Sequence, residues 1–297
     1  MKLSPATIKE KLEKVNHFIN MQTATTVFLA IRLKRPILIE GPAGVGKTSL
    51  ALAISKAFDY EFLKLQCYEG IDESKALYDW EYSKQLLYTQ ILKEKFKENF
   101  KEKNLTEILK DIKKSDSLFF SENFLIERPV LKAIRNHKKS LLLIDEIDKS
   151  EPQFEAFLLE VLSDFTISIP EIGIIKSTQI PLVILTSNAQ RVISDALRRR
   201  ALFLYLDYPE KELEIKIIQR KVPDLSKTDA EKLIELMEKI RKYPLKKLPG
   251  TSESIDWAKS MLMIGGINKE NIMNTVNIIS KHKSDADYIK NNIDTLI

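Results

Sequence analysis

A glycine-rich octapeptide is the feature of this sequence whose residue types and spacing point most directly to chemistry. It reads Gly41-Pro42-Ala43-Gly44-Val45-Gly46-Lys47-Thr48 and fits the pattern G-x-x-x-x-G-K-[ST]. Glycines allow backbone N–H groups to wrap around phosphates, while the lysine can reach the β- and γ-phosphates and the hydroxyl can bind Mg²⁺. We therefore expect the loop from Gly41 to Ser49 to bind a nucleotide, with Lys47 on its phosphates and Thr48 on the metal.

An acidic pair follows an apolar run further along the chain. Residues 141–144 are apolar and predict a buried strand, after which come Asp145 and Glu146. Alone, such a pair is equally well explained as a solvated strand end. Ligands of open α/β sheets lie beyond the carboxyl ends of the strands, so beside a phosphate-binding loop we expect Asp145 to hold the metal and Glu146 to polarise the attacking water. This chemistry suits hydrolysis better than transfer to a second small substrate.

An amide and an arginine run complete the candidate residues. Asn188 follows the apolar run 182–185 and can orient the water or contact the γ-phosphate, although asparagine is also an ordinary turn residue. The run Arg198-Arg199-Arg200 precedes the last apolar run. Basic runs usually lie on a solvated face, but in an assembling ATPase one of these arginines can reach the γ-phosphate held by a neighbouring subunit.

The elements that must position these residues form an alternating pattern. Short apolar runs at residues 37–39, 61–66, 141–144, 182–185 and 202–206 predict five strands, and helical segments such as 49–58 separate them. This order predicts an α/β fold with a parallel five-stranded sheet covered by helices on both faces. Before the first strand, apolar residues at intervals of three or four predict a helix over residues 8–33.

Two insertions and a helical C-terminal part complete the predicted organisation. Residues 71–122 are expected to form a helical insert whose segment 93–114 is rich in lysine and glutamate, and residues 165–178 a β-hairpin. After residue 208 the strand pattern ends, and helices are predicted from residue 226 to 240 and from 252 to 264. We expect an α/β nucleotide-binding domain at 1–208 and a small all-α lid domain at 209–297.

Composition narrows the protein class without choosing a function. Apolar residues make up 44% and charged residues 30%, as in ordinary globular proteins. Cys67 is the single cysteine, so no intramolecular disulfide can form, and no apolar run approaches the length of a membrane span; we expect a cytoplasmic protein. The 47 basic residues are interleaved with 42 acidic ones, which leaves a nucleic-acid partner as the minor alternative despite a net charge of +5.

Taken together, these motifs resemble those of AAA+ ATPases and, within them, the MoxR family. Residues 41–48 look like the Walker A motif, 141–146 the Walker B motif and Asn188 sensor 1, and the arginine run lies in the arginine-finger region. Arg199 best matches the family's spacing to Tyr208-Pro209, with Arg198 and Arg200 as alternatives. The resemblance implies the P-loop NTPase fold with a lid, ATP and Mg²⁺ as cofactors, and a hexameric ring in which the finger acts on the neighbouring subunit.

Three segments look most like the CoxD-type branch of that family, whose members assist the maturation of molybdenum-containing carbon monoxide dehydrogenase. They are residues 66–70, 155–160 and 195–200. This resemblance implies a chaperone-like remodelling role, with a von Willebrand factor A-type adaptor or another protein as partner. One departure concerns sensor 2: the matching stretch 250–255 contains no arginine or lysine, which favours the alternative of a slow-hydrolysing, nucleotide-gated switch.

Overall fold

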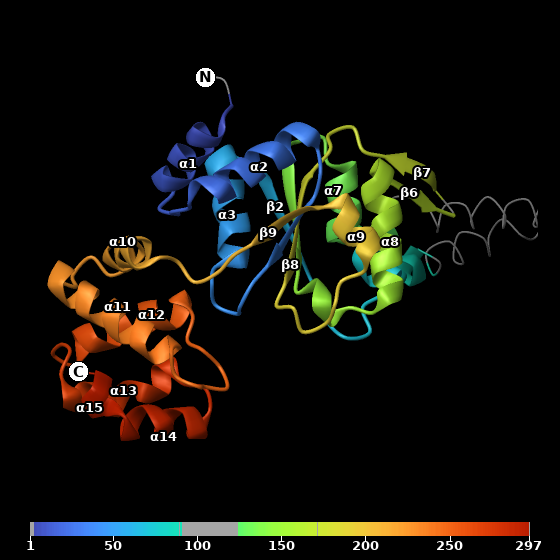
Figure 1. Cartoon of the computed structure of the whole chain (residues 1–297). Helices are drawn as coiled ribbons and strands as arrows, with labels where there is room; N and C mark the ends of the chain where they lie inside the picture. The colour runs from blue at the N-terminus through green and yellow to red at the C-terminus, as the bar shows by residue number, and fades with distance from the viewer. Residues whose placement is uncertain (1–2, 89, 91–123, 171, 297) are drawn as a thin grey trace, which may run out of the picture.

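A five-stranded parallel sheet forms the centre of the larger part of the molecule (Figure 1). The computed structural model describes residues 3–88, 90, 124–170 and 172–296. The sheet order is β2-β5-β8-β1-β9, and every neighbouring pair is parallel. Its strands are β1 (Ile37–Glu40), β2 (Glu61–Gln66), β5 (Ser140–Asp145), β8 (Leu182–Ser187) and β9 (Leu202–Tyr205). The five predicted strands and their parallel arrangement are thus confirmed.

Helices cover both faces of this sheet, and the alternation of side chains along the strands gives each face its own core. Ile37 and Ile39 of β1 pack with α1 (Pro5–Lys14), α2 (Met21–Leu33) and α3 (Lys47–Phe58). Leu38 between them belongs to the core on the other face. That face carries α7 (Pro129–Arg135), α8 (Pro152–Asp164) and α9 (Asp195–Arg200). Both cores hold the strands rigidly, so their carboxyl ends are fixed relative to one another.

The single helix predicted over residues 8–33 is wrong, because two helices occupy this stretch. Helix α1 ends at Lys14, and Asn16 adopts a left-handed φ of 62°. Asn20 then caps α2 by accepting a hydrogen bond from the Thr23 N–H at 2.8 Å. Asparagine tolerates a left-handed backbone and is a favoured N-cap residue. The two asparagines therefore end one helix and begin the next, although the apolar periodicity continues through them.

Short strands occur within both predicted insertions. The first contains α4 (Glu73–Leu77) and a strand β3 (Tyr78–Trp80), which pairs in antiparallel fashion with β4 (Leu125–Glu127) and was not predicted. The expected helical segment at 93–114 lies outside the described residues. The hairpin at 165–178 is confirmed as β6 (Thr166–Ile169) paired with β7 (Gly173–Lys176). Ile167 and Ile169 are buried in the core, whereas Ile174 is 77% exposed.

The C-terminal helices enclose a third core of their own. They are α10 (Lys211–Lys221), α11 (Lys227–Arg241), α12 (Thr251–Met263), α13 (Lys269–Ile279), α14 (Lys283–Asn291) and α15 (Ile293–Leu296). Trp257 and Met237 are fully buried in this core. As the sequence predicted, Ser226 caps α11 by accepting a hydrogen bond from the Asp229 N–H at 3.0 Å. Figure 1 shows this helical group beside the sheet, connected through the segment after β9.

Among the residues that the structure describes, no helix has both the length and the apolar character that crossing a bilayer requires.

Candidate active site

The glycine-rich loop connects β1 to α3 at the carboxyl edge of the sheet. Gly41 is required there by space, because a Cβ at this position would lie 1.9 Å from the carbonyl oxygen of Leu206. Gly46 precedes α3 with a left-handed φ of 98°, and Lys47 is the first residue of that helix. Helix α3 has 12 residues, and the loop places the N–H groups of its N-terminus at this edge. Such an arrangement attracts anions.

Lys47 lies buried within the loop with all three ammonium protons in hydrogen bonds. Its Nζ donates to the carbonyl oxygens of Gly41 at 2.6 Å and Pro42 at 2.8 Å, and to Oδ1 of Asn188 at 2.8 Å. Burial lowers the pKa of Lys47, while Asp148, Asp145 and Glu146 act in the opposite direction. The cation is thus held close to three carboxylates and bonded directly to the end of β8.

Asp145 ends β5 and is surrounded by donors. Its carboxylate accepts hydrogen bonds from the hydroxyls of Thr186 at 2.5 Å and Thr48 at 3.0 Å, and it forms an ion pair with Lys64 at 2.7 Å. Burial acts to raise the pKa of Asp145, but Lys64 and the two hydroxyls together hold it below its ordinary value. The carboxylate is therefore ionised at neutral pH and directly beside the Thr48 hydroxyl.

Glu146 follows in a backbone conformation that is uncommon for residues other than glycine. Its φ is 58°, and it precedes the short helix η2 (Ile147–Lys149). The carboxylate is held by Gln66 Nε2 at 3.0 Å, Asn188 Nδ2 at 3.3 Å and the Lys149 ammonium at 2.6 Å. The Glu146 N–H donates to the Thr186 hydroxyl at 2.9 Å, so Thr186 anchors both acidic residues.

Asp148 fixes the segment that follows β8. Its Oδ2 accepts hydrogen bonds from the backbone N–H groups of Asn188 at 3.1 Å and Gln190 at 3.0 Å. Asn188 therefore has a fixed backbone, and its side chain bridges Lys47 and Glu146. The structure thus brings Lys47, Asn188 and Glu146 into one hydrogen-bonded cluster.

The three consecutive arginines on α9 differ in their surroundings. Arg198 forms an ion pair with Glu40 and lies 5.8 Å from the Phe203 ring centroid, so it is engaged within its own chain. Arg199 and Arg200 are exposed, and no ion pair or side-chain hydrogen bond joins either of them to the described residues. Their main-chain carbonyls accept hydrogen bonds from the Arg35 guanidinium at 2.6 and 3.1 Å, which secures the end of α9.

Five residues of this site were not singled out from the sequence. Lys64 and Gln66 reach it from β2, Thr186 from β8, and Asp148 and Lys149 from η2. The positions of Lys64 and Gln66 depend on the pairing of β2 with β5, which aligns Gln66 with Asp145. The spacing of Lys64 and Gln66 by two residues on one strand was the available signal, because such residues share a face.

The stretch that lacks a basic sensor 2 residue lies against the phosphate-binding loop. The Ser252 N–H donates to the carbonyl oxygen of Gly44 at 3.3 Å, and a Cβ on Gly250 would lie 2.9 Å from the Ala43 carbonyl oxygen. Glu253 accepts hydrogen bonds from the Gly250 N–H at 3.0 Å and the Ser252 hydroxyl at 2.8 Å. The start of α12 therefore contacts the loop through backbone atoms and small side chains.

The nearby Arg241 is engaged elsewhere. Its guanidinium binds the carboxylate of Glu214 with two hydrogen bonds of 2.7 and 2.8 Å and lies 4.6 Å from the ring centroid of Tyr208. Its Nε also donates to the Pro249 carbonyl oxygen at 2.9 Å. Arg241 thus joins α11, α10 and the segment before α12, and this role explains its 10% side-chain exposure.

Comparisons with known proteins agree with this arrangement. Residues 37–207 match the family described as "ATPase family associated with various cellular activities (AAA)". The gas vesicle ATPase GvpN of Haloferax mediterranei is 26% identical over 239 residues. That alignment covers 75% of this chain, which spans 62% of the length of the relative.

Solved structures show the same fold. Two variants of Thermotoga maritima RuvB superpose with TM-scores of 0.51 and 0.53. Their sequence identities are 18% and 17%; the matches cover 93% and 89% of this chain and 71% of each RuvB chain. At these identities the likeness concerns the fold alone, and it includes the sheet that carries the cluster described above.

Proposed function

Because the chain belongs to the AAA family of ATPases, we propose that it binds ATP with Mg²⁺, hydrolyses it and couples hydrolysis to the remodelling of a partner protein. The observation that carries the catalytic part is the single cluster formed by Lys47, Asn188 and Glu146 beside Asp145 and Thr48. Residues from Gly41 to Ser49 provide the nucleotide-binding loop. Lys47 exchanges its bonds to the Gly41 and Pro42 carbonyls for bonds to phosphate oxygens.

The residues beside Lys47 fit Mg²⁺. This ion prefers oxygen ligands and is usually held by one or two carboxylates together with substrate phosphates and water. The Thr48 hydroxyl and the ionised Asp145 carboxylate lie 3.0 Å apart and supply such oxygens. Mg²⁺ bound there would reduce the negative charge on the phosphate oxygens. Asp145 and Thr48 hold the ion, and Thr186 keeps the Asp145 carboxylate in place.

Glu146 acts as the base that polarises the attacking water. Gln66, Asn188 and Lys149 fix its carboxylate at the edge of the nucleotide loop. A base must be held within hydrogen-bond reach of the water it activates, and three donors to one carboxylate provide that positioning. Asn188, bonded to both Lys47 and Glu146, orients the water relative to the γ-phosphate.

We also propose that the protein works as a homo-oligomeric ring, and a hexamer is the form that the resemblance implies. Proteins of this family are typically oligomeric. In the ring, Arg199 reaches the γ-phosphate of the neighbouring subunit, with Arg200 as the nearest alternative. The exposure of both side chains supports this role, whereas Arg198 is already paired with Glu40.

We further propose two domains and a cytoplasmic location, as the sequence predicts. Residues 1–208 are proposed as the nucleotide-binding domain and 209–297 as the lid domain. The separate core of α10 to α15 supports this division. The cytoplasm is proposed as the site of action.

The proposed client is a molybdenum hydroxylase undergoing maturation, delivered by a von Willebrand factor A-type adaptor. Support comes from the CoxD-like segments at 66–70, 155–160 and 195–200. The relative from Haloferax mediterranei is named a gas vesicle ATPase, which supports ATP hydrolysis in the service of another cellular component. On this chain the exposed Ile174 of the hairpin is the candidate client contact.

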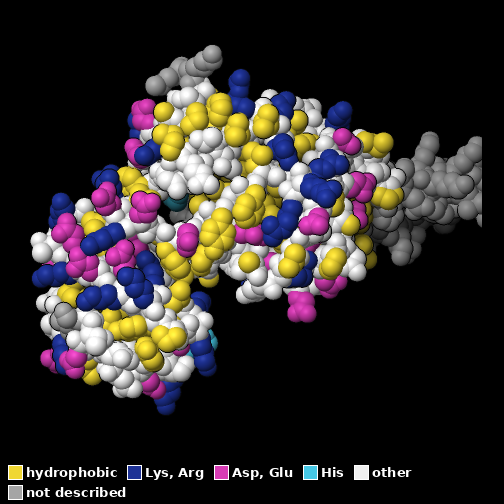
Figure 2. Space-filling view, viewed as in Figure 1, with side chains coloured by type: hydrophobic (Ala, Val, Ile, Leu, Met, Phe, Trp, Pro, Cys, Tyr) yellow, Lys and Arg dark blue, Asp and Glu magenta, His cyan; other side chains and the backbone are white. Residues whose placement is uncertain are grey.

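Two alternatives have specific observations behind them. A slow nucleotide-gated switch is favoured by the contact between α12 and the phosphate loop. Residues 250–255 make this contact and contain no lysine or arginine that could bind the γ-phosphate. A nucleic-acid-dependent ATPase is favoured only by the net charge of +5. Figure 2 shows basic and acidic side chains interspersed over the helical group, an arrangement that does not form a continuous basic surface on that face.

Steady-state ATP hydrolysis separates the three functions. The chain is assayed alone, with a partner that co-purifies with it, and with DNA or RNA. We expect stimulation by the protein partner and none by nucleic acid. Equal, slow turnover with and without the partner would favour the switch, and a large stimulation by DNA or RNA would favour the nucleic-acid-dependent function.

A further inference from the structure

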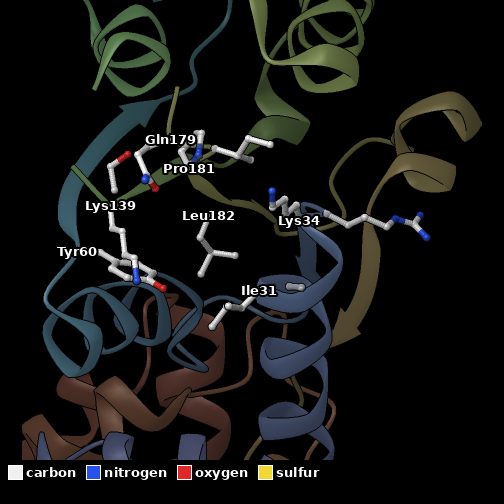
Figure 3. A pocket seen from close by; sticks show the side chains of 11 residues that line it. Ile31, Lys34, Tyr60, Lys139, Gln179, Pro181 and Leu182 are labelled. Carbon is white, nitrogen blue, oxygen red and sulfur yellow. The ribbon is translucent and has the colours of Figure 1, made fainter. Parts of the chain in front are cut away.

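A hollow lies at the amino ends of the strands, at the opposite edge of the sheet from the glycine-rich loop. It includes the beginnings of β5 and β8 and the end of α2, and the residues that line it include Ile31, Lys34, Arg35, Tyr60, Lys139 and Leu182. Its volume, open mouth included, is about 600 Å³. Figure 3 shows Lys139 and Tyr60 on one side, Lys34 and Ile31 on the other, and Leu182 between them.

The side chains that line this hollow carry positive charge alone. Lys34, Arg35 and Lys139 are cationic, and none of the lining residues is acidic. Neither lysine forms an ion pair with any residue in the described ranges. Arg35 uses its Nε and Nη2 to bind the carbonyls at the end of α9, and no hydrogen bond to a described residue involves its Nη1. The charges of these side chains therefore remain available to an anion.

Tyr60 contributes a hydroxyl to the same wall. Its side chain is half-buried, and burial raises the pKa of Tyr60, so the phenol keeps its proton at neutral pH and can donate a hydrogen bond.

We propose that this hollow binds a small ligand through a phosphate group. Lys34 and Lys139 provide positive charge from two sides, and the hydroxyl of Tyr60 donates a hydrogen bond to a phosphate oxygen. Ile31 and Leu182 offer apolar surface to whatever the phosphate is attached to. The site is separate from the nucleotide loop, because β1 and β5 run between the two edges of the sheet over a span of roughly 15–20 Å.

The ligand is either free inorganic phosphate or a phosphomonoester, and both share the group that the hollow recognises. Arg35 lines the hollow and also binds the carbonyl of Arg199 at 2.6 Å. A ligand bound here therefore lies one side chain away from the end of α9. Phosphate binding in the hollow does not require the roles that we assign to the residues at the nucleotide loop.

Titration of the full chain, saturated with Mg-ADP so that the nucleotide loop is filled, tests this site. ³¹P line broadening is followed for inorganic phosphate and, separately, for glycerol phosphate. The double variant Lys34→Gln/Lys139→Gln is expected to weaken binding at least about tenfold, the loss expected for about 1.4 kcal/mol. The control Lys138→Gln/Lys216→Gln removes the same charge from exposed lysines outside the hollow and should bind as the wild type does.

Tyr60→Phe provides an independent readout. It should weaken phosphate binding severalfold while leaving the melting temperature without phosphate unchanged, because it removes one hydrogen-bond donor and keeps the ring. Tighter binding of one probe identifies free phosphate or phosphomonoester as the ligand. Three results would overturn the proposal. They are equal broadening in the wild type and both double variants, competition by acetate that is as effective as that by phosphate, and no binding of either probe.

Discussion

Lys47 illustrates how one side chain can hold a site together. Its ammonium bonds to Gly41, Pro42 and Asn188, so it connects the phosphate loop to the end of β8. A buried cation is costly unless it is fully paired, and here the nearby carboxylates oppose the effect of burial on the pKa of Lys47. Negatively charged phosphates can take over the same bonds.

Lys47→Ala should therefore lose most of the affinity for nucleotide. Losing hydrogen bonds between a charged group and phosphate should cost about 1.5–3 kcal/mol, or roughly 10- to 100-fold in Kd. Binding of a fluorescent ATP analogue measures this loss. The exposed Lys56 on the same helix is the matched control, and a Lys47→Ala protein that binds as tightly as Lys56→Ala would contradict the assignment.

His17 makes stability depend on pH. Burial, with a smaller contribution from Lys221, lowers its pKa from 6.5 to about 4. Between these two pH values the unfolded chain binds a proton that the folded chain does not. The free energy of unfolding should therefore be highest above pH 6.5 and should decrease as the pH falls toward 4.

The decrease should be on the order of 3 kcal/mol, and the His17→Phe variant should show a shallower one. Urea unfolding between pH 7 and pH 4 measures both. The exposed His137 serves as the control, because His137→Phe should retain the wild-type pH dependence. Identical profiles for His17→Phe and the wild type would contradict the burial of a neutral imidazole.

At the scale of elements, the contact between α12 and the phosphate loop depends on a glycine. Gly250 has an ordinary φ of −86°, so its backbone conformation does not require glycine. Space does, because a Cβ would lie 2.9 Å from backbone atoms of Ala43 and Gly44. Gly250→Ala should push α12 away from the loop.

The expected result for Gly250→Ala is faster dissociation of bound ADP and a loss of stability of about 1–3 kcal/mol. Stopped-flow release of a fluorescent ADP analogue measures the first and chemical unfolding the second. Lys259→Ala, at an exposed position on the same helix, should change neither. Unchanged ADP release in Gly250→Ala would show that α12 does not restrain the loop.

The hairpin can be tested without removing its buried residues. Shortening it between residues 167 and 175 would delete Ile167 and Ile169, which belong to the core, whereas Ile174 is 77% exposed. Ile174→Ser should therefore leave basal ATP hydrolysis intact and reduce stimulation by the partner. Met263→Ser, at an 83% exposed position in the helical group, is the control. Full stimulation of Ile174→Ser would exclude this contact.

The sequence predicted the helices and strands better than it predicted which of them lie side by side. The five strands could be recognised because β1, β5 and β8 are buried on both faces and read as continuous apolar runs. The structure also brings the loop 41–48, Asp145, Glu146 and Asn188 together at one edge of the sheet. Lys64, Gln66 and Thr186 were missed, because their role depends on strand order and register, which periodicity along one strand does not contain.

Local signals also failed where short polar residues interrupt a pattern. The apolar periodicity of residues 8–33 hides the break at Asn16, and nothing in the lengths of the runs indicates that Tyr78–Trp80 pairs with Leu125–Glu127 across a long insertion. Both features depend on contacts that form only in the folded chain. The arginine run was found, but the pairing of Arg198 with Glu40 required the structure.

At the scale of the whole molecule, Arg199 should act on a neighbouring subunit. Arg199→Ala and Glu146→Gln proteins should each be nearly inactive, since such arginines contribute roughly 10³ to 10⁵ in rate. Mixed rings should recover activity at interfaces that combine an intact Arg199 with an intact Glu146. Arg32→Ala, at an exposed arginine in α2, controls for loss of charge. No recovery at any mixing ratio, with mixed rings verified, would contradict action in trans.

We propose that Glu146 activates water for hydrolysis of ATP held by the loop 41–48, and Glu146→Gln removes this ability. The amide keeps the size of the side chain and its place near Gln66, Asn188 and Lys149 but is not a base. ATP affinity and single-turnover hydrolysis should be measured on the same preparation. We predict near-wild-type ATP binding with hydrolysis slowed by roughly 10² to 10⁴. Hydrolysis at the wild-type rate would show that Glu146 is not the base that activates water.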